Sequence, residues 1–589
     1  MKTSATIPLK YTQFRRIWTA SVVTNVGQHL QAVAGAWLML ELTGSAFWTG
    51  VMVAAPTLPM LFVAMPAGAM ADLFDRRRVL LAAQATIATS ALLMGVFTVT
   101  GMITPQILLG LGLMLGIGQC FNIPSWQAIV PDLVPNEHVP SAVSLNSASF
   151  NLARSVGPAL GGALVAAFGP GPAFILNAVG YLAVMSAIYT FKSHGPEDGA
   201  RTGSITSEIA SGLRYARFTP QIRWLLLVAA CFAITSGVVQ SVLPTYTEQS
   251  FTGTAALYGI LLGCMGAGAL TGAFMRPMLS ERLGKRMVPS GIAAFGVAGI
   301  GLGLAGNPAL AGLAMAILGL LWTTVLATLN ATTQLLAPAW VRGRIMSLYT
   351  LSFMGILPLG HVLAGSIADV AGPRTAVVSL SVGCLVLGLA TFRIPLPVIS
   401  QVETPTVDRG EYVESQPHPT GIKGGPTMVI TTWTIADADL EPFLKVMDQL
   451  RQVRLRTGAY RWRLYRDVMD PHRMTEVFLC TSWDAHLAQH RRIDHLSRRV
   501  IERARSFDVS GDALTHHLTA VDTSDPTHLP TWEELDAHAD MHRTDGSVPL
   551  PVQRAATGEL PMLGNGAGAE RLPVPGESAP RKEPSESSA

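Results

Sequence analysis

Charged residues are scarce in this sequence. Of its 589 residues, 14% are charged and 49% are hydrophobic, and the mean hydropathy is +0.36. An ordinary soluble domain carries about 25% charged residues, so this class of protein is excluded for most of the chain. The formal net charge of +3 gives no reason to expect nucleic acid as a partner. The lipid bilayer is the expected environment instead.

Cysteines are also few. There are five, and none lies in a CxxC or cysteine–histidine spacing typical of a zinc site. Cys480 lies in a strand-like segment, and the others lie in apolar runs: Cys120, Cys231, Cys264 and Cys384. Their expected role is that of small buried apolar side chains. The sequence therefore predicts no metal site, no disulfide framework and no cofactor.

What the chain does contain is an internal repeat. The stretch that begins at Ser144, SLNSASFNLARSVGPALGGALVAAFGPGPA, recurs without gaps 203 residues later from Ser347, as SLYTLSFMGILPLGHVLAGSIADVAGPRTA. Ten positions are identical, including Gly157, Gly162 and Gly169. The repeat predicts two similar membrane halves, an arrangement typical of secondary transporters. The pattern GxxxxGK[ST] is missing, which argues against ATP-driven transport by this chain.

Twelve segments are long and apolar enough to cross a membrane, which takes roughly 20 residues in a helix. We predict spans at 18–42, 46–71, 79–101, 105–130, 141–168, 172–191, 222–247, 255–279, 287–305, 308–335, 345–371 and 374–394. Basic residues concentrate in alternate connections, as the positive-inside rule requires. They are Lys2, Lys10, Arg15, Arg16, Arg76, Arg77, Arg78, Lys192, Arg201, Arg214, Arg217, Arg282, Lys285, Arg286, Arg342 and Arg344. Both termini are therefore expected in the cytoplasm.

The turn after the second span reads Gly68-Ala-Met-Ala-Asp72-Leu-Phe-Asp75, followed by the basic residues Arg76, Arg77 and Arg78. This turn resembles the signature loop of the major facilitator superfamily. Gly68 permits close helix approach. Asp72 is expected to interact with the positive end of a neighbouring helix or with a nearby arginine, and so to latch one conformation. Leu73 and Asp75 depart from the family pattern. The alternative is a solvated loop whose charges only set the topology.

The fifth span carries Gly157, Pro158, Gly161 and Gly162, and this resembles the glycine- and proline-rich fifth helix of exporters in the same superfamily. Helix packing alone explains the glycines. It does not explain Arg154, because an arginine at the centre of a membrane helix costs roughly 2.5–3.5 kcal/mol on insertion scales. The repeat has Leu357 at the equivalent position.

A substrate cavity is therefore expected around Arg154. Asn151 lies one turn earlier on the same helix face. Asn25 and Gln28, three residues apart in the first span, either line this cavity or hydrogen-bond between helices. Arg154 is assigned to substrate or gating contacts.

Three further residues are candidates for carrying protons. Glu41 and Glu248 lie near the outer ends of the first and seventh spans, at roughly equivalent places in the two halves. An acid at a membrane boundary is more often simply solvated. His361 in the eleventh span titrates near neutral pH when unperturbed, and a hydrogen-bonded packing role is its alternative. No carboxylate is unambiguously placed at mid-membrane.

Beyond a linker at 396–425, the composition becomes that of a soluble domain. We predict a strand from Met428, a helix at 439–456, strands at 459–468 and 474–483, a helix at 484–506 and a strand at 513–521. This βαββαβ order is ferredoxin-like. His486, His490 and His495 lie in the second helix, but two histidines four apart without a nearby third ligand favour a solvated face over a metal site.

The C-terminal module resembles the dimeric α+β barrels that include antibiotic-biosynthesis monooxygenases. The membrane part, with WLMLELTGS from Trp37 and RGRIMSLY from Arg342, resembles the enterobactin-exporter branch of the major facilitator superfamily. The C-terminal module contains Gly458-Ala-Tyr-Arg-Trp462 and Glu476-Val-Phe-Leu-Cys-Thr-Ser-Trp483. With these segments, the joined architecture is similar to the bacterial transmembrane secretion effectors. This resemblance implies a bacterial plasma (inner) membrane antiporter that exports siderophore-like or drug-like molecules with the proton gradient. It also implies a homodimer through the C-terminal domain.

The expected fold is thus an all-α polytopic membrane protein of twelve helices in two six-helix repeats, with a small α+β domain appended. The expected segments are 1–17 (cytoplasmic N-terminus), 18–192 (first bundle), 193–221 (linker), 222–395 (second bundle), 396–425 (linker), 426–525 (ferredoxin-like domain) and 526–589 (disordered tail). A transporter, not an enzyme, is predicted. The alternative is a membrane-anchored enzyme or scaffold that acts through the C-terminal domain.

Overall fold

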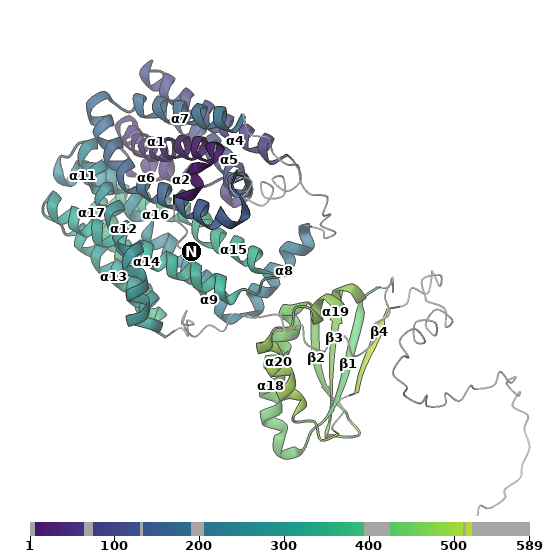
Figure 1. Cartoon of the computed structure of the whole chain (residues 1–589). Coiled ribbons are helices and arrows are strands. Elements are labelled where there is room, and N and C mark those ends of the chain that lie inside the picture. Colours follow the sequence, from purple (N-terminus) through teal and green to yellow (C-terminus); the bar gives the residue numbers. More distant parts are fainter. Residues whose placement is uncertain are drawn as a thin grey trace, which may run out of the picture. The chain divides into compact units, whose positions relative to one another are not determined.

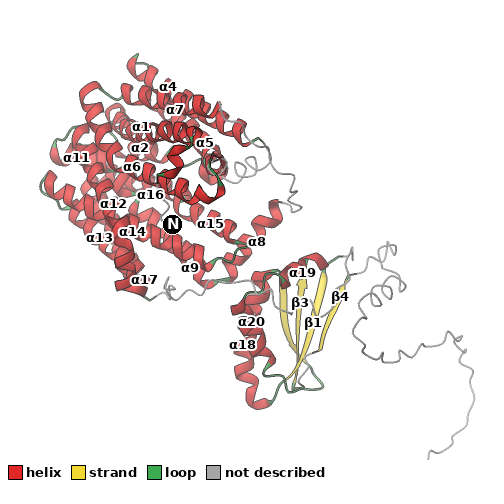
Figure 2. Cartoon of the chain, in the orientation of Figure 1, coloured by secondary structure: helices red, strands yellow, loops and turns green. Residues whose placement is uncertain are grey.

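The computed structural model describes residues 6–63, 75–129, 133–189, 205–393, 425–510 and 514–520. Helices dominate up to Thr391, and the four strands all lie in the C-terminal domain (Figures 1 and 2). The predicted linker at 396–425 lies outside the described residues except for its last residue. The predicted tail at 526–589 lies outside them entirely.

The predicted spans are mostly helical where the structure describes them, but turns at 55–59 interrupt the span predicted at 46–71, and the span predicted at 222–247 is divided into three helices. The first half consists of α1 (Thr12–Thr43), α2 (Ala46–Ala54), α4 (Arg76–Val99), α5 (Pro105–Ile129), α6 (Val139–Phe168) and α7 (Gly171–Tyr189). The helix α8 (Ile205–Phe218) occupies the predicted linker between the halves. The second half consists of α9 (Pro220–Ser236), α10 (Val238–Ser241), α11 (Leu243–Phe251), α12 (Ala255–Leu283), α13 (Met287–Gly303), α14 (Pro308–Leu336), α15 (Arg342–Thr350), α16 (Leu357–Ala371) and α17 (Pro373–Thr391).

Eight helical stretches among the described residues are long and apolar enough to cross a membrane. One of them, Ala255–Gly303, joins two predicted spans. Neither α1 nor α6 is among the eight, although they have 32 and 30 residues. Both carry polar residues that a purely lipid-facing helix would not tolerate, among them Gln28 in α1 and Arg154 in α6.

The repeat seen in the sequence is reproduced in the backbone. α6 begins at Val139 and ends at Phe168, and the stretch from α15 to α16 begins and ends 203 residues later, at Arg342 and Ala371. Gly169 and Gly372 end the two segments with φ of 77° and 86°, which a side chain disfavours. The halves differ inside the segment, because a π-helical turn at Leu351–Gly355 interrupts the second one.

The two halves meet closely at the end of the bundle that carries the short connections at Gly44 and Gly372, here called the Gly44 end. α6 packs on α12, and α16 packs on α2. A Cβ added to Gly162 would lie 2.5 Å from the carbonyl oxygen of Ala255, and one added to Gly365 would lie 2.6 Å from that of Ala46. Gly162 and Gly365 are equivalent positions of the repeat. Each therefore lets its helix approach the first turn of a helix in the other half.

The C-terminal domain has the predicted ferredoxin-like order. Its strands are β1 (Thr427–Thr434), β2 (Arg461–Arg466), β3 (Arg473–Cys480) and β4 (Leu514–Thr519), in the antiparallel sheet order β2-β3-β1-β4. Its helices are α18 (Leu440–Thr457), α19 (Trp483–His490) and α20 (His495–Arg505). Trp433 and Phe443 are buried between sheet and helices.

The prediction of one helix over 484–506 is wrong. α19 ends at His490, and Asp494 adopts an extended conformation and caps α20 by accepting a hydrogen bond from the backbone N–H of Ser497 at 2.7 Å. Aspartate is a preferred N-cap residue, so the sequence carried a start signal for a second helix at this point.

Substitution at Gly162 is expected to destabilise the contact between the halves. Gly162→Ala places a methyl group against the backbone of α12, and overpacking of this kind costs about 1–3 kcal/mol. We expect a lower melting temperature for the detergent-purified protein, measured by fluorescence-detected size-exclusion after heating. Gly301→Ala in α13 is the matched control, because its Cβ would meet no atom within 4 Å. Equal melting temperatures for the two variants would contradict the proposed role.

Candidate functional site

The two halves enclose a central cavity of about 560 Å³. Its wall is contributed mainly by α1, α2, α5, α6 and α7 of the first half, and by α10, α12 and the helix that begins at Arg342 of the second. Its polar lining residues are Gln28, His29, Gln31, Thr57, Gln119, Arg154, Asn177, Tyr181, Gln240, Tyr258 and Thr350. Most of the remaining wall is apolar, with Met52, Met60, Met94, Met265 and Met354 among its residues. Such a wall suits a small amphiphilic ligand.

A hydrogen-bond network fixes the polar side chains of the first half. The hydroxyl of Tyr181 accepts hydrogen bonds from Gln28 Nε2 at 2.5 Å and from Gln119 Nε2 at 3.0 Å. Behind them, Asn122 Nδ2 donates to Gln119 Oε1 at 3.2 Å, and Gln84 Nε2 donates to Asn122 Oδ1 at 2.7 Å. Both lone pairs of the Tyr181 hydroxyl are thus used, so its hydrogen is left to donate elsewhere.

Arg154 gives the cavity its formal charge. Arg154 and His29 both line the cavity, and none of its lining residues in the described part of the chain is acidic. His29 lies close to α6, because a Cβ on Gly157 would meet the Cβ of His29 at 2.6 Å. A guanidinium in an apolar, acid-free wall favours an anionic or oxygen-rich ligand.

Two of the four predicted cavity residues line the cavity, and two lie away from its wall. Gln28 and Arg154 line it. Asn25 instead donates a hydrogen bond to Ser149 Oγ at 3.2 Å, which ties α1 to α6. Asn151 donates to the backbone carbonyl of Ser147 at 2.9 Å within α6.

The fifth-helix motif packs the bundle together. Gly157 and Gly161 let α6 approach α1 at His29 and Leu30, while Gly162 lets it approach α12. Pro158 is buried inside α6 and also borders the cavity. The motif thus positions Arg154, which lies one turn before Pro158.

The predicted gating loop is only partly described. Gly68 and Asp72 lie outside the described residues, and so does the side chain of Arg76. Asp75 caps α4, since its Oδ1 accepts hydrogen bonds from the backbone N–H groups of Arg77 at 2.8 Å and Arg78 at 3.3 Å.

The basic residue Arg77 contacts its own half of the protein. Its guanidinium donates to the backbone carbonyl of Tyr189, and it lies 5.4 Å from the centre of the Tyr189 ring. Arg78 is exposed. The gating role of this loop stays a prediction.

None of the three predicted proton carriers lines the cavity. Glu41 is exposed and accepts a hydrogen bond from Trp37 Nε1 at 2.6 Å, and Glu248 is exposed as well. His361 is 2% exposed, and its Nδ1 lies 3.0 Å from the carbonyl oxygen of Gly237. This geometry matches the packing role that was the alternative for His361.

A carboxylate that the sequence reading missed joins the halves at the Gly44 end. Asp369 of α16 accepts hydrogen bonds at the N-terminus of α2. Its Oδ1 accepts from the backbone N–H groups of Ala46 at 2.6 Å and Phe47 at 3.2 Å, and its Oδ2 accepts from Ser45 Oγ at 2.6 Å. Negative charge at a helix N-terminus is stabilising. Asp369 therefore ties α16 of the second half to α2 of the first half at this end of the bundle.

Several cavity residues were also missed. His29, Gln31, Gln119, Asn177 and Tyr181 all lie within predicted spans, where a polar side chain needs a partner or a wet surface. That general signal was present for each of them. Which of them face the cavity depends on helix rotation, and glycine contacts set this rotation.

The predicted histidines of the C-terminal domain separate into two groups. His486 and His490 lie on α19, and His495 is the first residue of α20. His517 of β4 lies beside the first two, with its ring centre 4.9 Å from that of His486. Burial, and then the neighbouring His490 and His517, lower the pKa of His486 to about 3. Its imidazole is therefore neutral at physiological pH.

Comparison with known proteins decides the family. The family model described as transmembrane secretion effector matches residues 3–524. The chain belongs to this family. The major facilitator fold predicted from the sequence is confirmed with it.

Curated relatives of this family member are bacterial transport proteins. The multidrug efflux pump Tap of Mycolicibacterium fortuitum is 27% identical over 386 residues, which cover 64% of this chain and 94% of Tap. The staphyloferrin A transporter of Staphylococcus aureus is 25% identical, and the alignment covers 63% of this chain and 94% of that transporter. The enterobactin exporter EntS of Citrobacter koseri is 26% identical, and the alignment covers 65% of this chain and 94% of EntS.

Solved structures show the same fold. A bacterial homologue of the human lysosomal transporter Spinster, in an inward-facing and unoccupied conformation, matches with a TM-score of 0.55 and 16% identity, covering 66% of this chain and 96% of that one. The nucleoside transporter NupG matches with a TM-score of 0.53 and 12% identity, and the match covers 65% of this chain and 98% of the NupG chain. The resemblance of the C-terminal domain to dimeric α+β barrels stays a prediction.

Removal of the charge at Asp369 is expected to open the Gly44 end. Asp369→Asn replaces one carboxylate oxygen with an amide NH₂ group, which cannot accept a hydrogen bond from Ser45 or from the backbone N–H groups of Ala46 and Phe47. A hydrogen bond to a charged group contributes about 1.5–3 kcal/mol. Spin labels at Leu42→Cys in α1 and Val370→Cys in α16, both exposed, would report the opening. In a background without native cysteines, we expect double electron–electron resonance to show a new longer-distance population. Glu248→Gln, an exposed acid on α11, is the control and should leave the distances unchanged.

Proposed function

We propose that the protein is a secondary transporter that exports small molecules by alternating access. The observation that carries the proposal is a central cavity between two repeat-related halves, closed at the Gly44 end by glycine contacts and by Asp369. Binding between repeats, followed by rocking of one half against the other, is the general mechanism of such folds. The efflux and export activities in the names of Tap and EntS support the direction of transport.

The proposed substrates are amphiphilic molecules with anionic or acceptor-rich oxygen groups. Arg154 would contact the oxygen groups, Tyr181 would donate a hydrogen bond, and the methionine-rich wall would cover the apolar part. Siderophore-like and drug-like molecules both meet this description. The names of the staphyloferrin A transporter and of Tap support these two classes.

The proposed location is the plasma (inner) membrane of a bacterium, with both termini in the cytoplasm. The alternating basic residues of the connections support this orientation. In this orientation the Gly44 end faces outward, so the closed contacts form the outer gate. The cavity then corresponds to an inward-facing state that loads substrate from the cytoplasm.

Coupling to the proton gradient is part of the proposal, since the sequence carries no nucleotide-binding pattern. His29 is the histidine that lines the cavity, next to the residue assigned to the substrate. It is a better placed proton carrier than Glu41, Glu248 or His361, which do not line the cavity. Protonation of His29 would place a second positive charge in the cavity that holds Arg154, so the charge state of His29 and the binding of an anionic substrate would be coupled.

The alternative function, an enzyme or scaffold anchored by the membrane part, has less support. The relatives are matched over nearly their whole length, while about a third of this chain has no counterpart in those alignments. The transport activity is therefore assigned to the membrane part. Pairing of two chains through the C-terminal domain remains a prediction that light scattering on the purified protein would test.

Export is expected to depend on Arg154. Cells without their own exporters would express the wild type, Arg154→Gln or Asn151→Ala, and the accumulation of siderophores, dyes and antibiotics would be measured with and without a protonophore. We expect the initial export rate to fall about tenfold or more for Arg154→Gln, equivalent to a loss of about 1.4 kcal/mol in binding. Asn151→Ala, one turn away and outside the cavity wall, should export as the wild type does. Export by Arg154→Gln at the wild-type rate would contradict the assignment.

A chain truncated after Arg393 is expected to retain export. The membrane part carries the cavity and the gate, and its fold is shared with proteins matched over two thirds of this chain. The same accumulation assay would measure the activity, with the membrane content of each protein determined by immunoblot. A truncated protein that reaches the membrane at wild-type level without exporting would place an essential step in the C-terminal domain.

A further inference from the structure

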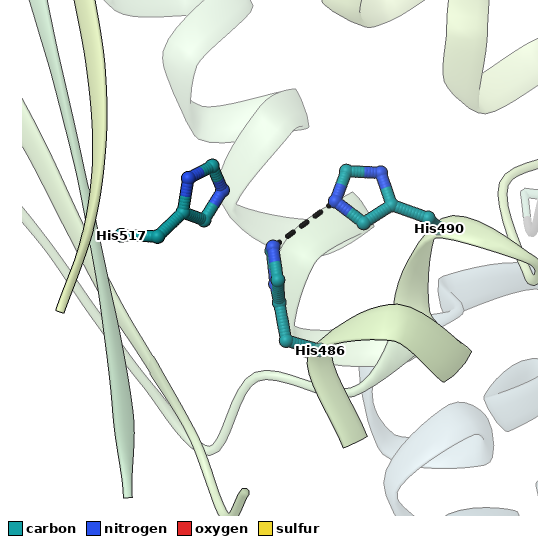
Figure 3. Close-up of side chains that lie close together, drawn as sticks. All are labelled: His486, His490 and His517. Carbon is teal, nitrogen blue, oxygen red and sulfur yellow. Dashed lines mark hydrogen bonds between the residues drawn. The ribbon is translucent and has the colours of Figure 1, made fainter. Parts of the chain in front are cut away.

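Three histidines converge in the C-terminal domain, although they are distant in sequence. His486 and His490 extend from α19, and His517 extends from β4 (Figure 3). One ring nitrogen from each lies within 4.8 Å of the other two. His486 is 1% exposed, His490 is half-buried and His517 is exposed. The group thus extends from the domain interior to its surface.

The spacing of the ring nitrogens is close to that of a metal site. Nε2 of His486 and Nε2 of His490 are 3.0 Å apart. Two imidazole nitrogens on a tetrahedral zinc, each about 2.0–2.1 Å from the metal, are about 3.3–3.4 Å apart. The third nitrogen is up to 4.8 Å away. Metal binding would therefore require the exposed His517 side chain to bring its ring nitrogen closer to the other two.

The position of His517 on the strand is decisive for this convergence. Side chains alternate between the faces of a strand, and His517 pairs in register with Val429, which is 2% exposed beneath the helices. His517 is thus directed to the helix-covered face, where α19 lies. Its neighbour His516 pairs with the half-buried Ile430 and points to the other face.

The electrostatic surroundings are compatible with a cation. Arg454, which acts electrostatically on His486, is paired with Glu476 at 3.1 Å. Nε2 of His486 faces Nε2 of His490 at hydrogen-bond distance. A metal ion bound between the two nitrogens would replace this hydrogen bond.

We propose that His486, His490 and His517 form a binding site for a divalent transition-metal ion of the zinc class. Neutral imidazole is the preferred protein ligand of Zn²⁺, Cu²⁺ and Ni²⁺. Three protein ligands leave one position of a tetrahedral ion for water or another small ligand. Since β4 lies at the edge of the sheet formed by the described strands, next to β1, the ion would also tie that strand to α19.

The test is metal binding by the full chain. The protein would be purified in detergent through a tag without histidines, stripped with a chelator, incubated with zinc sulfate and desalted. We expect about one zinc per chain by mass spectrometry. Cobalt substitution should give the visible absorption bands of a four-coordinate site. Competition with a fluorescent chelator would give the affinity.

The variants separate this site from other zinc binding. His517→Ala and His490→Gln should each weaken zinc binding at least about tenfold, since each removes one of three ligands. The matched controls His516→Ala and His495→Ala should bind as the wild type does. In the presence of chelator, the wild type and the four variants should have the same melting curve. Added zinc should raise the melting temperature only of the proteins that retain His486, His490 and His517. Substoichiometric zinc in the wild type would overturn the proposal, and so would unchanged affinity in both His517→Ala and His490→Gln.

Discussion

Close helix approach at two repeat-related glycines is the constraint on which the rest of the structure depends. Gly162 and Gly365 bring α6 and α16 against the first turns of α12 and α2 in the opposite half. Lipid supplies no hydrophobic force between helices, so contact at small residues provides much of the attraction between them. These contacts bring the two halves together at the Gly44 end of the bundle. The polar wall around Arg154 lies between the same two halves. The same glycines thus set both the shape of the cavity and the place where it must open.

The cavity departs from the repeat where function needs asymmetry. Arg154 is matched by Leu357, and the carboxylate of Asp369 has Ala166 as its counterpart. Most of the hydrogen-bonded polar lining comes from the first half. A symmetric pair of halves would bind a substrate in two equivalent ways. If Arg154 contacts the substrate as proposed, one charged residue in one half would give the substrate a single orientation, while the second half could move against it.

The sequence predicted what depends on length, apolarity and local periodicity. The helical character of the spans, the repeat and the ferredoxin-like strand order follow from such patterns and were confirmed, whereas the interruptions within the spans at 46–71 and 222–247 were not predicted. Asp369, the Tyr181 network and the approach of His517 to α19 were not predicted. Each of these contacts joins residues that are more than 20 positions apart in the sequence. Predicting them requires knowing which face of one helix or strand packs against another. The break between α19 and α20 is different. Asp494 is a local capping signal that the sequence contains, but the predicted helix over 484–506 was extended through it.

The energetics of Arg154 connect fold and function. Its insertion into a membrane helix costs roughly 2.5–3.5 kcal/mol, whereas leucine is favourable at such a position. Selection for stability alone would place a residue like Leu357 in both halves. The arginine therefore lowers the stability of the protein without a substrate, and an oxygen-rich ligand would offset part of this cost. When the site is empty, the uncompensated arginine raises the free energy of the conformation that exposes it, and a bound substrate lowers that free energy. This difference between the empty and the occupied protein would allow a substrate to shift an alternating-access equilibrium.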